Sequence, residues 1–254
     1  MTERRVESFR VASRLVGNTA DLRLDASYYN PRALAAVQAL DESGMEIRTL
    51  GDVAERVFIP PRFKRIYVDA AHGVPFLQGS HVLQLRLTDL KYLSRKAHKG
   101  LERWIIQSGW VLVTCSGTVG RVAITPSHWD GWAASQHILR IVPKDDSHCP
   151  VGYLATYLAS PLGQAQLTAQ IYGAVVDELT EEQARSVRVP IPTTRAQRLK
   201  VKEINEMAME ALRMRDEAFT SGEAATATLD RLLPHEEHSA PAAIPVRGVD
   251  AASG

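Results

Sequence analysis

The chain has 254 residues, of which 45% are hydrophobic and 23% charged, and a formal net charge of +1 at pH 7. This composition is ordinary for a soluble globular protein, and no apolar run reaches the ~20 residues that cross a bilayer, which argues against a membrane protein. The first residues lack an apolar core, so we expect no secretory signal. Cys115 and Cys149 show no metal-ligand spacing, and we expect a cytoplasmic protein without a bound metal.

Residues 1–47 form an N-terminal segment with one short predicted helix. Asn30 can cap this helix and Pro31 suits its first position. Apolar residues then recur at helical spacing from Ala33 to Leu40, and the pattern stops near Ser43-Gly44.

Residues 48–192 combine short strands with helices. Strands are predicted where stretches rich in Val and Ile are bounded by Gly, Pro or Ser, in "RTLGDVAERVFI", "GVPFLQGSHV", "WVLVTCSG", "GRVAI" and "HILRIVP". The stretch "PVGYLATYLASPLGQAQLTAQ" has a helical period, with Pro161 opening a second helix after a Ser160 cap, and "SVRVPIP" predicts a further strand. The pattern predicts an α+β domain with a curled, mostly antiparallel sheet and peripheral helices.

Residues 193–233 predict one long helix, because "TRAQRLKVKEINEMAMEALRMRDEAF" contains neither Gly nor Pro. Its apolar residues recur at three-, four- and seven-residue spacings, which favours a coiled-coil seam between two chains. The seam would contain Val201, Ile204, Ala208, Ala211, Arg215 and Ala218. An amphipathic helix packed on its own domain is the alternative. Residues 234–254 are rich in Pro, Ala and Ser and predict a disordered tail.

Basic charge is concentrated between Arg62 and Arg103. This stretch holds nine Lys and Arg against three Asp and Glu, although the whole chain is nearly neutral. A local basic cluster is typical of contacts with nucleic-acid phosphates, and a solvated face with an accidental bias is the alternative.

The sequence shows no strong catalytic motif. The glycines Gly117 and Gly120 are too close together for a P-loop, which also needs a Lys after its second glycine. Cys115 could act as a nucleophile with His128 or His137, but a lone cysteine in an apolar strand is more often a core residue.

Four stretches, in this order and spacing, resemble the DNA-specificity (S) subunits of Type I restriction–modification systems. They are "RLDASYYNP", "LGDVAERV", "GWVLVTCSGTVGRVAI" followed by "AASQHILRIVP", and "YGAVVDELTEEQARSVRVPIPTTRAQ". The likeness covers residues 23–218. Such subunits usually hold two target recognition domains and two long helices, whereas this chain has room for one of each. It therefore resembles a half-size S subunit.

The resemblance implies a non-catalytic subunit of a restriction–modification or phage-defence system that recognises a sequence in double-stranded DNA. It also implies a DNA methyltransferase (M) subunit as a partner, with a restriction (R) subunit as a further one. A second S-type chain would supply the other recognition domain, and we expect a homodimer. The chain itself would bind no cofactor, since S-adenosylmethionine would belong to the methyltransferase.

Loops of the recognition domain would bring base-reading side chains to the major groove while Lys and Arg neutralise phosphates. The glycines after Cys115 would let a tight turn bring the backbone near DNA. The expected DNA-binding residues are Arg62, Lys64, Arg65, Gln78, Ser80, His81, Arg95, Lys96, Lys99, Ser116, Thr118, Arg121 and Tyr172.

Two other functions stay open at this point. Asp69, Asp89 and Lys91 have the loose acid-and-lysine spacing of a small Mg-dependent nuclease. A non-DNA adaptor, whose helix recruits partners and whose basic stretch is incidental, is the other alternative.

Overall fold

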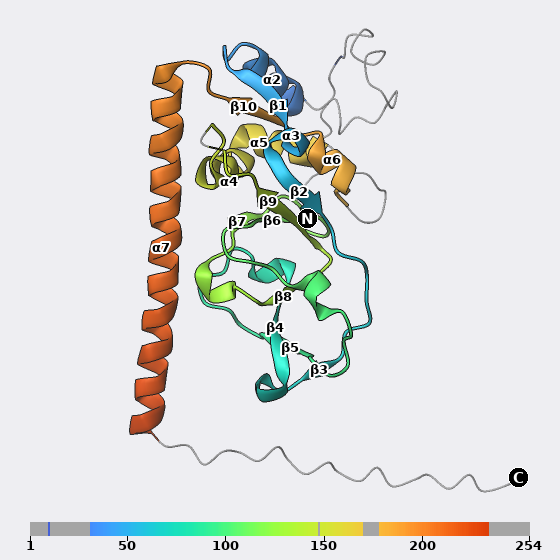
Figure 1. Ribbon diagram of the computed structural model, residues 1–254, viewed down its shortest axis with the longest axis vertical. Helices are drawn as coiled ribbons and strands as arrows, with labels where there is room; N and C mark the ends of the chain where they lie inside the picture. Colours follow the sequence, from blue (N-terminus) through green and yellow to red (C-terminus); the bar gives the residue numbers. More distant parts are fainter. Residues whose placement is uncertain (1–9, 11–30, 147, 170–177, 234–254) are drawn as a thin grey trace, which may run out of the picture.

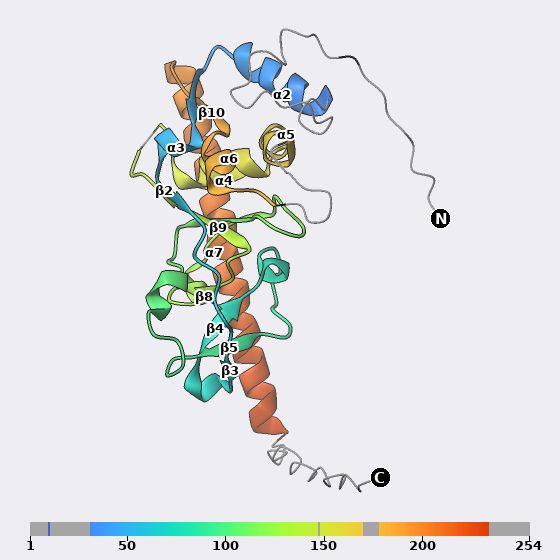
Figure 2. The same cartoon turned by 90° about the vertical axis from the view of Figure 1, so that its right-hand side faces the viewer.

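The computed structural model describes residues 31–146, 148–169 and 178–233, together with residue 10. Figures 1 and 2 show an elongated molecule in which one long helix, α7 (Arg195–Leu232), runs beside a series of small sheets and helices. None of the described helices is both long enough and apolar enough to span a bilayer. The predicted tail at residues 234–254 lies outside the described residues.

The central sheet has four antiparallel strands in the order β2-β9-β6-β7. These are β2 (Ala54–Phe58), β9 (Ile138–Pro143), β6 (Val111–Thr114) and β7 (Val122–Ile124). In β6 every residue is buried, as expected for an apolar strand between two neighbours with a layer on each face. Its register places Val111 opposite Ile124 on one side and Ile141 on the other.

A second four-stranded sheet lies beyond the central one, in the order β3-β5-β4-β8. Its members are β3 (Tyr67–Val68), β5 (Lys91–Ser94), β4 (Gly73–Leu77) and β8 (Ala133–Ala134). The pair β4-β8 is parallel and the other pairs are antiparallel. The α+β class with mostly antiparallel strands is thus confirmed, and the strands divide between two sheets rather than forming a single curled one.

The opposite end of the molecule is built from helices around the antiparallel pair β1 (Glu46–Thr49) and β10 (Arg188–Ile191). The helices are α2 (Pro31–Asp41), α3 (Leu50–Val53), α4 (Val151–Ala159), α5 (Pro161–Ala169) and α6 (Glu181–Arg185). The predicted break between α4 and α5 is confirmed, with the Ser160 hydroxyl accepting from Gly163 N at 3.3 Å. The expected boundary at residue 47 falls inside β1.

One predicted strand is interrupted. The stretch from residue 48 to 59 contains the end of β1, helix α3 and then β2. The cause is a capping box, in which the Thr49 hydroxyl accepts from Asp52 N and the Asp52 carboxylate accepts from Thr49 N at 3.1 Å. Such reciprocal bonds satisfy the first helical amides and stabilise even one turn.

The first part of helix α7 packs on its own domain, which corrects the expected seam at Val201, Ile204 and Ala208. Val201 is buried in the main core, and Ile204 and Leu212 pack against that core from the same face. Ala208 lies against α4, where a Cβ built on Gly152 would come 3.0 Å from the alanine Cβ. The helical spacing of these residues therefore reflects an intramolecular contact, as the alternative of an amphipathic helix packed on its own domain predicts.

Candidate functional site

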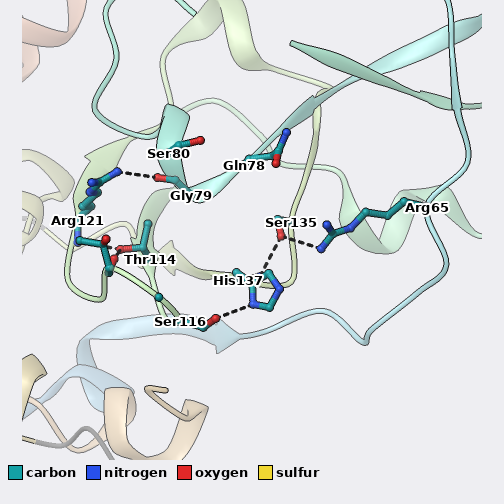
Figure 3. A pocket seen from close by; sticks show the side chains of 11 residues that line it. Arg65, Gln78, Gly79, Ser80, Thr114, Ser116, Arg121, Ser135 and His137 are labelled. Carbon is teal, nitrogen blue, oxygen red and sulfur yellow. Dashed lines mark hydrogen bonds between the residues drawn. The ribbon is translucent and has the colours of Figure 1, made fainter. Parts of the chain in front are cut away.

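A concave site of about 410 Å³ lies where β4 ends and the β6–β7 loop begins (Figure 3). Its lining is polar and comes from four separate parts of the chain. The lining residues are Arg65, Gln78, Gly79, Ser80, Thr114, Ser116, Gly117, Thr118, Arg121, Ser135 and His137.

Thr114, the last residue of β6, closes the glycine-containing loop. Its hydroxyl donates to the Thr118 carbonyl at 2.5 Å and accepts from Arg121 N at 3.0 Å, while its carbonyl accepts from Gly120 N at 2.9 Å. Because these bonds join both ends of the loop, Ser116 and Thr118 are held in a compact turn at the edge of the site.

The two glycines of this loop have different tasks. Gly120 has φ +91°, and a Cβ there would lie 2.7 Å from the Gln164 side-chain oxygen. Gly117 has φ +74° and nothing within 4 Å of a built Cβ. Both therefore supply a backbone conformation that L-residues avoid. Only Gly117 faces open space, which corrects the expectation that both bring the backbone toward a ligand.

Arg121 and Arg65 lie on opposite sides of the site in Figure 3. Arg121 donates from Nη1 to the Gly79 carbonyl at 3.4 Å and so links the loop to the end of β4. Arg65 donates from Nη2 to the side-chain oxygens of Gln136 at 2.9 Å and Ser135 at 3.4 Å. Each guanidinium keeps further N–H groups beyond these bonds.

The floor between the two arginines is formed by His137 and Ser116. The His137 Nδ1 and the Ser116 Oγ are 2.7 Å apart, and the His137 Nε2 lies 3.0 Å from the Gln136 side-chain nitrogen. Burial is the main cause that lowers the pKa of His137, and the nearby charges of Arg65 and Arg62 lower it further. The ring is therefore neutral at pH 7.

Buried Arg140 supports this floor from below. Its guanidinium donates to the carbonyls of Ala134 at 2.6 Å, Ser135 at 2.9 Å and Trp104 at 3.4 Å, and also to the Ile138 carbonyl. Burial lowers the pKa of Arg140 to about 9, which still leaves it charged at pH 7. These bonds satisfy the carbonyls of the turn that carries Gln136 and His137, and so fix its shape.

The described residues that line the site supply guanidinium, hydroxyl, amide and imidazole groups and no carboxylate. Such a set offers mainly hydrogen-bond donors with positive charge. It suits a ligand that is rich in acceptors or negatively charged.

The structure brings together part of the predicted DNA-binding set. The members that line the site are Arg65, Gln78, Ser80, Ser116, Thr118 and Arg121. His81 is a correction, because only 4% of the residue is exposed and its Nδ1 accepts from Gln78 N at 3.3 Å inside the turn. Burial lowers the pKa of His81, as expected for a core histidine.

The other predicted contacts lie elsewhere. Arg62 is exposed and pairs with Glu178 at 3.7 Å, and Lys64 is exposed beside Arg65. Three basic residues occupy the turn after β5, which lies beside the start of β4 and is joined to the segment before Arg65 through His98 Nε2, 3.0 Å from the Lys64 carbonyl: Arg95, Lys96 and Lys99. Tyr172 lies outside the described residues.

Sequence reasoning missed the second wall of the site. Ser135 and His137 line it, and Gln136 lies directly behind. The signal was present as the polar triplet "SQH" between the apolar strands β8 and β9, because three consecutive polar residues between buried strands require partners. From the sequence alone, His137 is a candidate only as a base for Cys115.

The catalytic alternatives gain no support from the geometry. Burial raises the pKa of the Cys115 thiol to about 12, which is the opposite of an activated nucleophile. Within residues 31–146, 148–169 and 178–233, Asp69 and Asp89 join no group of three or more residues that could hold a metal ion.

The remaining predicted seam residues divide between two roles. Arg215 donates to the carbonyls of Gln84 at 2.8 Å and Val82 at 3.3 Å, and its guanidinium lies 4.4 Å from the Trp129 ring centre. It is therefore an internal contact and not a partner contact. Ala211 and Ala218 are exposed and line a shallow groove beside Leu83 and Leu85.

Comparisons with known proteins bear on this architecture. A family model described as "Type I restriction modification DNA specificity domain" matches residues 42–206, more than half of the chain. No curated protein matches the sequence of this chain.

Several solved structures are similar. One is the HsdS subunit from Thermoanaerobacter tengcongensis, with 18% identity and TM-score 0.47, covering 87% of this chain and 55% of that one. Another, from work on complex assembly of the type I R-M system, has 17% identity and TM-score 0.46, covering 87% and 54%. The type IIG restriction endonuclease BpuSI has 10% identity and TM-score 0.50, covering 74% and 29%. At such identities the likeness concerns the fold alone, and this chain spans about half the length of the first two.

Proposed function

The chain belongs to the family of Type I restriction modification DNA specificity domains, and from this premise we propose that it binds double-stranded DNA at a particular sequence. The observation that carries the proposal is the donor-lined site between Arg65 and Arg121. Hydrogen bonds hold the side chains at this site in place, as recognition of a particular base requires. Neutralising a phosphate needs only an exposed charge.

In this proposal the two basic regions act differently. Arg121, Ser116 and their neighbours contact base edges in the major groove, which is wide enough to admit the β6–β7 loop. Lys64 and the basic turn after β5 contact phosphates and set the position of the domain on the duplex. The family assigns recognition and not catalysis, so the chain brings its DNA to an enzyme.

The enzyme in the proposal is a DNA methyltransferase, which binds S-adenosylmethionine, with a restriction subunit as a further partner in defence against phage. The support is the family alone. Copurification of the full chain with the methyltransferase, followed by mapping of methylated positions in wild type and Arg121→Ala cells, tests it. An unchanged methylated motif would contradict the assignment of Arg121.

The exposed face of α7 supports a second S-type chain as a partner. Leu83 and Leu85 are each 58% exposed and Met214 is 55% exposed, and they line one shallow groove together with Ala211 and Ala218. We propose that α7 of a second copy covers it, because the S subunits that this chain resembles usually hold two recognition domains and this chain has room for one. Contiguous exposed apolar side chains of this kind mark interaction surfaces.

Light scattering on the full chain tests this assembly. Met214→Glu should produce a monomer, because it buries an unpaired charge in the pair. Leu199→Glu is the matched control, since Leu199 is 60% exposed on the same helix outside the groove. Equal masses for the two variants would show that the interface between chains lies outside this groove.

Selection from a random duplex library tests the central proposal. The full chain should enrich one motif, and its affinity should fall steeply as salt is raised, since phosphate contacts release counterions. Binding without any enriched motif would show a general DNA-binding protein, and no binding would contradict the proposal outright.

A further inference from the structure

A continuous series of hydrogen bonds runs through the second wall of the site, from Arg65 to Ser116. Arg65 Nη2 is 2.9 Å from Gln136 Oε1, and Gln136 Nε2 is 3.0 Å from His137 Nε2. The other ring nitrogen, His137 Nδ1, is 2.7 Å from Ser116 Oγ. We call these four side chains the relay.

The chemistry of the first member fixes the direction of every proton in the relay. A guanidinium can only donate, so the group of Gln136 that faces Arg65 must be its carbonyl oxygen. The amide nitrogen then faces His137 and donates to Nε2. The ring proton must therefore sit on Nδ1, where it is donated to Ser116 Oγ.

Two further observations support a neutral His137 with this proton. Burial and the charges of Arg65 and Arg62 all lower its pKa. The backbone also keeps the ring in place, because Cys115 N donates to the His137 carbonyl at 2.9 Å and His137 N donates to Ser135 Oγ at 3.2 Å. The ring cannot turn over without breaking the bond to Gln136.

The bond from His137 occupies one of the two lone pairs of the Ser116 oxygen and leaves the hydroxyl proton free to donate. Among the described residues no other group bonds to the Ser116 side chain. Ser116 lines the same site as Arg121, whose Nη1 reaches the Gly79 carbonyl while other N–H groups stay available. Both groups therefore present donors to the site.

We propose that the relay leaves the Ser116 proton free for the site and that Ser116, donating together with Arg121, selects guanine. Guanine shows two acceptors, N7 and O6, on its major-groove edge, whereas cytosine shows a donor and adenine shows one of each. This inference rests on the proposed function, because it assumes that the site meets a base edge.

The first test compares motifs selected from a random duplex library by the full wild-type chain and by Ser116→Ala. One guanine in the wild-type motif should lose about five-fold of its preference, as expected for one neutral hydrogen bond, and the other positions should not change. Ser108→Ala, an exposed serine away from the site, should keep the whole motif.

An isosteric pair at His137 tests the direction of the relay. Asparagine in His137→Asn can still donate to Ser116, so guanine should stay preferred. Aspartate in His137→Asp can only accept, so Ser116 must donate to it and turn its lone pairs to the site. The same position should then favour a base that donates, cytosine or adenine. Selection of one and the same base by both variants would overturn the relay.

A measurement without DNA covers the case in which a variant folds poorly. Nitrogen NMR of the ¹⁵N-histidine-labelled chain at pH 7.5 should show the Nδ1–H form for His137, assigned by the signal lost in His137→Asn. A proton on Nε2, or an imidazolium, overturns the relay whatever the DNA results. If wild type enriches no motif, the proposed function and the inference fall together. If it enriches one that Ser116→Ala leaves intact, the inference alone falls.

Discussion

Two basic regions of this domain carry similar charge and differ in how that charge is held. At the site between β4 and the β6–β7 loop, Arg65 and Arg121 are half-buried, and they donate hydrogen bonds to the Gln136 side chain and to the Gly79 carbonyl, respectively. On the turn after β5, Arg95, Lys96 and Lys99 are exposed. A guanidinium held by hydrogen bonds can be positioned against one base edge, whereas an exposed basic side chain is sufficient to contact a phosphate. Under the proposed function, exposed charge positions the domain on DNA, and the hydrogen-bond partners of each arginine decide whether it can read a base.

The largest expected effect comes from removing both fixed arginines. Arg65→Ala with Arg121→Ala should weaken binding to the selected motif by about 1–3 kcal/mol for the base contact of Arg121, and further because the loss of Arg65 removes the first bond of the relay. Binding to unrelated DNA should change far less. Competition titrations with motif and random duplexes measure both. A uniform loss on all sequences would place these arginines on phosphates.

The loop itself should be sensitive at one glycine more than at the other. Gly120→Ala should lower the free energy of unfolding by about 2–3 kcal/mol, from left-handed strain of ~1–2 kcal/mol and contact with Gln164. Gly117→Ala meets open space and should cost only ~1–2 kcal/mol for the strain. Urea denaturation gives both values. Equal losses would mean that Gln164 moves aside freely.

The exposed turn should respond to salt and not to sequence. Arg95→Ala with Lys96→Ala should reduce the slope of log affinity against log salt by about 2, at ~0.9 for each phosphate contact. The selected motif should stay the same. A narrower or altered motif in this variant would mean that the turn reads bases, and the contrast between the regions would then be lost.

Acid should affect the site and leave the charges of Arg95, Lys96 and Lys99 on the turn unchanged, which is the smallest expected effect. The pKa values of His81 and His137 are lowered by burial, so their contribution to stability is complete above the unfolded value of 6.5. It declines as pH falls below 6.5 toward the folded values, since the unfolded chain takes up more protons. Lys and Arg keep their charge throughout.

The ratio of affinities for the motif and for a random duplex, measured at pH 7.5 and 5.5, checks this pH effect. Melting temperatures at each pH report the change in stability. The ratio should fall at pH 5.5 while the salt slope is retained. His72→Gln, at an exposed histidine, should behave as wild type. A ratio that does not depend on pH would contradict a titrating group at the site.

The sequence was sufficient for features that depend on local chemistry. The Pro161 break between α4 and α5 needed only capping rules. The glycine loop was located because "SGTVG" lies between two apolar strands. These elements are set by neighbours a few residues away.

Features that depend on distant partners could not be read in this way. His81 and Ser80 are adjacent in the sequence, yet the fold buries the first and exposes the second. Gln136 gains its role only because β9 lies beside β6 and Arg65 reaches across. Likewise, the period of Val201 and Ile204 fits an internal and an intermolecular contact equally well. Only the tertiary contacts distinguish these cases.

The attachment of α7 has a consequence for how such domains can be exchanged. Beyond Val201, the helix is bound to the second half of the domain by Asp216, which accepts from His128 Nδ1 at 2.6 Å and from the Ser127 amide at 3.1 Å. Phe219 stacks on the His128 ring at 4.0 Å. A chimera joined between β10 and α7 would separate these matched faces and leave the carboxylate without its donors. The unit that can be transplanted into another protein, by recombination or by design, is therefore the recognition domain together with its own helix.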